Sequence, residues 1–282
     1  MTKIITDQHF TGERALFKSR DIKLVDCLLN DGESHIKESC DVTAENCTFG
    51  WKYPLWYGNN LTVEGGKLLP EARAAIWYST NVKFDNVEIL APKAFRRAKD
   101  VTLTNVHFTD AAETLWGCSY VKLTDVYAAG NYFAMNCSDV AAYNLTIDGN
   151  YCFDGARNVT LHDCVLNSKD SFWNCDNVTV YDTVIKGEYL GWNSRNLTFV
   201  NCTIDSLQGL CYVDGLKLVN CRLADTNLCF EYCSNIDAEI VGNVVSVKNP
   251  LSGKIVADGY GEIILDDNDV DHTKTQILVR GK

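Results

Sequence analysis

Aromatic and acidic side chains recur in register along this chain of 282 residues. Five of its six tryptophans share one offset of a repeat of about 19 to 21 residues: Trp56, Trp77, Trp116, Trp173 and Trp192. Glu113, Asp154 and Asp170 are the acidic residues nearest the middle of this set. Aromatic rings cover the apolar C–H faces of sugars, and two carboxylates that flank a glycosidic bond can act as acid and base. We therefore expect a carbohydrate site in which Glu113, Asp154 and Asp170 are the candidate catalytic residues.

The candidate substrate-binding residues belong to the same outward rows. Arg96 and Arg97 could orient a carboxylate or a phosphate. The full set is Trp77, Arg96, Arg97, Trp116, Tyr132, Tyr151, Trp173, Tyr189 and Trp192. A second interpretation stays open, because large exposed apolar patches usually mark an interface. On that interpretation the protein is a non-catalytic assembly module, and the aromatic flank is covered by a second subunit.

An aliphatic repeat is the element that must position these side chains. Its members, called the anchor row below, are Ile22, Val42, Leu61, Val82, Val101, Val121, Val140, Val159, Val178, Leu197, Leu216 and Ile236. So regular a period predicts a solenoid. The residue two positions after each anchor is also apolar, with a polar residue between them, which is the alternation of a β-strand. Asn or Asp usually follows four positions after the anchor and predicts a bend, because these residues tolerate left-handed backbone.

Two further apolar rows in each repeat predict three short strands and three turns per coil. We therefore predict an all-β, single-stranded, right-handed parallel β-helix of about twelve coils, with 19–21 residues per coil. The handedness follows from the general bias of parallel crossover connections. We expect one domain over residues 1–282, in which 1–14 form an N-terminal cap, 15–247 the coils, and 248–282 the last coil and a C-terminal cap. The Asn and Asp residues at the bends would form an asparagine ladder.

Segments such as DVTLTNV (100–106), NVTLHDC (158–164) and NLTFVNC (196–202) are variants of one pattern. This pattern resembles the pectin-lyase-like β-helix superfamily from about residue 12 to residue 266. Within it, the chain looks like a bacterial family known only as a domain of unknown function. The resemblance implies the fold and a substrate groove on the tryptophan flank. It implies no defined reaction, because the chain lacks the Gly-His-Gly and Asn-Thr-Asp motifs of the polygalacturonase-like hydrolases.

The thirteen cysteines are expected to be reduced and mostly to fill the core. Several of them share the row five positions after the anchor, where other coils carry Val, and buried Cys behaves as a small apolar residue. The Asp-rich stretch 266–271 has the composition of a calcium loop but not the EF-hand spacing, which favours a turn in the terminal cap. We expect neither a bound metal nor a cofactor.

The net charge of −11 disfavours nucleic acid and anionic membrane surfaces as partners. An oligosaccharide or another small molecule is the expected partner, and a homo-oligomer stays open. The first ten residues contain no apolar stretch of the length that a secretory signal requires, so the chain is expected to be cytoplasmic.

Overall fold

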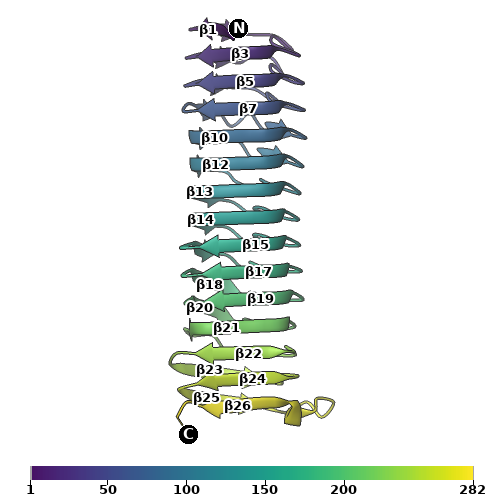
Figure 1. Cartoon of the computed structure of the whole chain (residues 1–282), viewed down its shortest axis with the longest axis vertical. Helices are drawn as coiled ribbons and strands as arrows, with labels where there is room; N and C mark the ends of the chain where they lie inside the picture. Colours follow the sequence, from purple (N-terminus) through teal and green to yellow (C-terminus); the bar gives the residue numbers. More distant parts are fainter. Residues whose placement is uncertain (1, 282) are drawn as a thin grey trace. The chain divides into compact units, whose positions relative to one another are not determined.

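The computed structural model describes residues 2–281 and is built from parallel strands. It divides into two compact units, the first ending at Leu145 and the second beginning at Thr146, inside strand β14 (Ser138–Asp148). Apart from one short 3-10 helix, the described elements are all strands (Figure 1). No described helix is long and apolar enough to cross a membrane. The prediction of an all-β fold, with parallel strands stacked coil on coil as in a β-helix, is confirmed.

The first unit stacks its strands coil on coil, with β3, β5, β7, β10 and β12 side by side (Figure 1). Val82 lies in register with Leu61 on one side and with Val101 on the other. Besides β14, the strands are β1 (Lys3–Thr6), β2 (His9–Phe10), β3 (Arg20–Val25), β4 (Leu28–Leu29), β5 (Cys40–Glu45), β6 (Thr48–Phe49), β7 (Asn59–Glu64), β8 (Lys67–Leu68), β9 (Ile76–Trp77), β10 (Thr80–Ile89), β11 (Phe95–Arg96), β12 (Lys99–Phe108) and β13 (Ser119–Ala129).

The second unit repeats the same pairing. Val178 lies in register between Val159 and Leu197. Its elements are β15 (Arg157–His162), β16 (Val165–Asn167), β17 (Asp176–Tyr181), β18 (Val184–Glu188), β19 (Arg195–Val200), β20 (Thr203–Leu207), β21 (Asp214–Leu223), β22 (Ile236–Ile240), β23 (Asn243–Lys248), β24 (Gly253–Ala257), β25 (Gly259–Ile264), η1 (His272–Lys274) and β26 (Thr275–Val279).

The anchor row forms the core of both units, as predicted, since each of its twelve members is at most 6% exposed. The bend four positions after the anchor also has the predicted left-handed backbone, for example at Asp163 and Asn201. A second left-handed position, immediately before the anchor, was not predicted; Asn158 and Asn177 are examples. Hydrogen bonds join such side chains between coils, as from Asn177 Nδ2 to Asn158 Oδ1 at 2.8 Å.

The number of coils differs from the prediction. Fifteen described strands occupy the anchor position, where about twelve coils were expected. β1 lies inside the expected N-terminal cap and pairs with β3, and β24 and β26 form two coils in residues 248–282, where one last coil and a cap were expected. In these strands the anchor position holds Lys3, Gly253 and Thr275, none of which is aliphatic, so the aliphatic repeat does not reveal them. Handedness and the single domain stay predictions.

The third side of each coil is a chain of turns more often than a strand, which corrects the expectation of three strands per coil. β9 and β11 are strands there and pair with each other. In other coils the inward residue of this side has left-handed backbone, with φ of 59° at Phe153 and 57° at Leu210. A left-handed residue interrupts the extended conformation that a strand requires.

All thirteen cysteines of the described chain are free thiols, and every one except Cys40 is buried. Burial raises the pKa of Cys152 to about 11 and that of Cys211 to about 12. Thiols of this kind stay protonated and unreactive near neutral pH, because the thiolate is the nucleophile.

Candidate functional site

The outward row on the third side of the first unit is held in register by its inward neighbours. Ile76 and Phe95 are fully buried, and the next residues, Trp77 and Arg96, point outward because side chains alternate along β9 and β11. Arg96 pairs with Trp77 on one side and bridges to Trp116 on the other. The sequence prediction of one outward row is therefore correct in this unit.

The rings of this row cover one another. The Trp56 and Trp77 rings stack with centroids 5.3 Å apart and an interplanar angle of 10°. The Arg96 guanidinium carbon lies 4.5 Å from the Trp77 ring centroid and 4.6 Å from that of Trp116. Lys37 Nζ lies 5.9 Å from the Trp56 ring centroid. Both faces of Trp77 are thus occupied by the protein itself, and the stack offers ring edges to solvent.

Glu113 lies beside this stack and contacts two cations. Arg96 Nη2 donates a hydrogen bond to Glu113 Oε2 at 2.9 Å, and Lys93 Nζ lies 3.1 Å from Glu113 Oε1. Trp77 Nε1 donates to the Lys93 carbonyl oxygen at 2.8 Å. Both carboxylate oxygens of Glu113 are thus engaged by cations of the same surface. This arrangement favours a structural role for Glu113 in place of the catalytic role expected from the sequence.

Trp173 lies in the corresponding outward row of the second unit. Phe172, fully buried, donates from its backbone to the Leu190 carbonyl at 3.0 Å, and Asn174 donates to the Trp192 carbonyl at 3.0 Å. These two bonds hold Trp173 outward, where it is 36% exposed. The Tyr151 ring lies beside it, with centroids 6.2 Å apart and an interplanar angle of 38°.

Two more predicted residues, Tyr189 and Trp192, lie together in the next coil. Their rings meet edge to face, with centroids 5.5 Å apart. Trp192 also stacks on Tyr212, at 5.1 Å and 23°. Tyr212 was not among the candidates, although Tyr57, Tyr78, Tyr212 and Tyr232 share the row four positions before the anchor. That row was the signal that could have identified it.

Asp154 and Asp170 lie in this unit and have no ion pair among its described residues. Burial raises the pKa of Asp154, and a hydrogen bond from Asn174 Nδ2 at 3.2 Å opposes the rise. Burial, followed by the negative charges of Asp154 and Glu188, raises the pKa of Asp170 to about 6. A carboxyl group that keeps its proton near pH 6 can serve as a general acid beside an ionised neighbour.

The structure thus separates the predicted residues into two groups. Trp77, Arg96, Trp116 and Glu113 meet in the first unit, and Tyr151, Trp173, Asp154 and Asp170 belong to the second. Arg97 and Tyr132 are exposed residues of the first unit. A cluster of all three predicted catalytic carboxylates is not formed within either unit.

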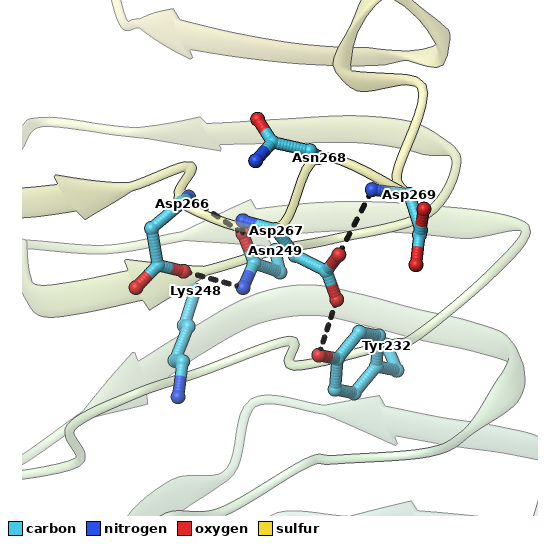
Figure 2. A pocket seen from close by; sticks show the side chains of 7 residues that line it. All are labelled: Tyr232, Lys248, Asn249, Asp266, Asp267, Asn268 and Asp269. Carbon is cyan, nitrogen blue, oxygen red and sulfur yellow. Dashed lines mark hydrogen bonds between the residues drawn. The ribbon is translucent and has the colours of Figure 1, made fainter.

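The Asp-rich turn lines a separate open depression of about 560 Å³ (Figure 2). Tyr232 Oη donates to Asp267 Oδ2 at 2.6 Å, and the Asp269 amide donates to Asp267 Oδ1 at 2.9 Å. Asn249 Nδ2 donates to Asp266 Oδ1 at 2.8 Å. These carboxylates close the turn, and the described residues contain no group of three or more His, Cys, Asp or Glu that could hold a metal ion.

Comparison with known proteins identifies a family without an assigned activity. The family model described as "Protein of unknown function (DUF3737)" matches residues 3–278. No curated protein sequence matches the chain.

Similar solved structures include the surface adhesin PfbA of Streptococcus pneumoniae, at 11% identity, over 91% of this chain and 82% of that one, with a TM-score of 0.40. The catalytic domain of a GH87 alpha-1,3-glucanase in complex with nigerose has 11% identity, over 100% of this chain and 64% of that one, with a TM-score of 0.35. A tailspike protein of the E. coli bacteriophage HK620 in complex with a hexasaccharide has 9% identity, over 93% and 71%, with a TM-score of 0.41. At such scores these similarities carry no argument about what this chain binds.

Proposed function

We propose that this chain, which belongs to the DUF3737 family of proteins of unknown function, is a carbohydrate-binding protein that uses the aromatic and acidic side of its second unit. This surface, called the second-unit flank below, consists of Tyr151, Asp154, Asp170, Trp173, Tyr189 and Trp192. The observation that carries the proposal is the exposure of Trp173, 36%, beside partly buried carboxylates that form no ion pair among the described residues.

Each component of the flank matches a feature of a sugar. The Trp173 and Tyr151 rings can cover the apolar C–H face of a pyranose, and Asp154 and Asp170 can accept hydrogen bonds from its hydroxyl groups. Asp154 already accepts a hydrogen bond from Asn174, and the remaining acceptor positions of both carboxylates can take further donors from a ligand. The flank is therefore suited to a ligand that donates hydrogen bonds.

The first unit supports this assignment by contrast. Its tryptophans occupy the same offset in the repeat, but stacking and the Arg96 guanidinium already cover Trp77. A sugar ring would have to displace these contacts, each worth about 0.5–2 kcal/mol. Trp77 is consequently the matched control for Trp173.

A non-catalytic assembly module is the second candidate function. Leu207 and Tyr212, 50% and 43% exposed, add apolar area to the outer surface of the second unit. Exposed apolar area of this kind favours association with another subunit. On this alternative Trp173 contacts a second copy of the chain, and no sugar competes with the contact in solution.

The test is a titration of tryptophan fluorescence with neutral and charged oligosaccharides. We expect saturable quenching that weakens about 2- to 10-fold in Trp173→Ala, because an aromatic contact contributes about 0.5–1.5 kcal/mol beyond its buried area. Trp77→Ala should bind as tightly as the wild type. Sedimentation of the same variants separates the alternatives: if Trp173→Ala shifts an oligomer to monomer and no oligosaccharide quenches the fluorescence, the assembly module replaces the carbohydrate-binding function.

A further inference from the structure

Cations from the protein itself lie over tryptophan rings of the first unit but not over Trp173 and Trp192 of the second. Eight cation–π contacts lie in the first unit. Arg96 lies between Trp77 and Trp116, and Lys99 Nζ is 5.3 Å from the Tyr120 ring centroid. Among the described residues, no cation lies over the rings of Trp173 and Trp192. Their π-faces therefore lack the positive charge that their counterparts in the first unit have.

The charged side chains near these rings also differ between the two units. In the first unit, Lys93, Arg96 and Arg97 outnumber Glu113. In the second unit, the charged groups that act on Asp170 are Asp154, Glu188 and one cation, Lys169, whose Nζ is engaged by Glu188 Oε2 at 2.9 Å. Asp154 and Asp170 thus form no ion pair within the described chain, beside rings that also attract cations.

We infer that the second-unit flank selects carbohydrates that carry positive charge, namely amino sugars with ammonium groups. This rests on the proposed function, because the Trp173 and Tyr151 rings are assigned to the sugar face. An ammonium group placed between the Trp173 ring and Asp170 would gain a cation–π contact and a Coulombic attraction to the carboxylate together. An N-acetylated sugar would keep the ring contact but lose both charge terms.

The electrostatics of Asp170 makes this selectivity depend on pH. The charged and titratable groups that act on it are Asp154, Glu188 and Lys169, and Cys211 lies within range. Because burial and the two carboxylates raise its pKa to about 6, Asp170 repels its neighbours when ionised and is neutral at acid pH. A bound cation relieves this repulsion and favours ionisation, so binding and proton release are linked.

The experiment compares two tetrasaccharides by calorimetry. One is an N-trimethylated glucosamine tetramer, whose charge does not change with pH, and the other is the neutral N-acetylglucosamine tetramer. At pH 7 we expect the cationic tetramer to bind at least tenfold more tightly. At pH 4.5, where Asp170 is protonated, this advantage should be largely lost.

Variants locate the effect. Asp170→Asn should remove the advantage of the cationic tetramer at pH 7, so that its affinity falls to that of the neutral tetramer measured with the same variant. Glu262→Gln, which removes an exposed carboxylate of β25, should leave both affinities unchanged. Spermidine, a cation without sugar rings, should compete weakly.

Each of the other outcomes would reject a specific part of the proposal. Equal affinity for the two tetramers, or preference for a galacturonate oligomer, rejects charge selection and leaves carbohydrate binding in place. If spermidine competes as strongly as the cationic tetramer, recognition of the sugar is rejected, and the flank is a site for amines. Absence of binding by every oligosaccharide rejects the inference and the proposed function together.

Discussion

Trp77 and Trp173 occupy the same offset of the repeat but meet different surroundings. Trp77 lies between the Trp56 ring and the Arg96 guanidinium, whereas Trp173 is 36% exposed beside Tyr151. At the same offset of the repeat, the coil that follows Trp77 has Arg96, and the coil that precedes Trp173 has Asp154. A guanidinium stacks on an indole face, and a carboxylate does not. The residues of the neighbouring coils therefore distinguish the packed Trp77 ring from the exposed Trp173 ring.

Asp170→Asn should stabilise the protein in a pH-dependent manner. The pKa of Asp170 is raised to about 6 in the folded state, above the 3.8 of an unperturbed Asp, so the ionised carboxylate opposes folding. Wild-type stability should thus fall as the pH rises from about 4 to about 6 and then level off. Because solvent screens a partly exposed group, we expect a gain of about 1 kcal/mol for Asn at pH 7, or about 2–4 °C in Tm.

Thermal unfolding of both proteins between pH 4 and pH 8 checks this. The two melting temperatures should converge near pH 4. A lower Tm for the Asn variant at pH 7 would show that the Asp170 carboxylate is compensated by contacts that stabilise its ionised form.

At the scale of the strand and the turn, local chemistry made much of the fold predictable. The alternation around Val159 and the left-handed tolerance of Asp163 depend on residues close in sequence, so a single repeat unit already encodes them. β24 and β26 form two coils where one was predicted, because their registers are set by pairing with the preceding strand and not by a local motif. The ring contacts of Arg96 depend on side chains one coil apart, which the period alone does not determine.

Val159→Asp should prevent folding of the repeat. Val159 is 1% exposed in β15, and an unpaired charge at such a position costs several kcal/mol, a large part of the stability of a domain. Thr160→Asp, one residue later on the outward face, is the matched control and should fold. Circular dichroism distinguishes them; a native β-sheet spectrum and wild-type Tm for Val159→Asp would contradict the placement of the anchor row.

At the scale of the whole molecule, the charge of the chain hides how charge is distributed. A net charge of −11 disfavours anionic partners in general. It adds the charges of the whole chain and says nothing about where they lie. It could not reveal that basic residues gather beside the tryptophans of the first unit and acidic residues beside those of the second. For the same reason, the carbohydrate site was expected along the whole row and is now proposed for one unit.

The thirteen thiols offer a test of packing along the entire chain. Cys40 is the one that is not buried, and Arg20 Nη1 lies 2.8 Å from its sulfur. Partial burial raises the pKa of Cys40, so its labelling by a disulfide reagent should be slow at pH 7 and faster at pH 9. We expect one thiol per native chain to react, and none in Cys40→Ser. Rapid labelling of several thiols in the native Cys40→Ser variant would contradict the buried cysteine rows.

The most direct test of carbohydrate binding at the second-unit flank is the chemical shift of each tryptophan indole N–H during titration with the neutral and cationic glucosamine tetramers. Single Trp→Ala variants assign the signals. The Trp173 and Trp192 signals should move saturably with ligand. The Trp56 and Trp77 signals should stay in place, because their indole N–H groups donate to the carbonyl oxygens of Ala74 and Lys93 within the first unit. Saturable movement of the Trp77 signal with a stationary Trp173 signal would contradict the assignment of the site to the second unit.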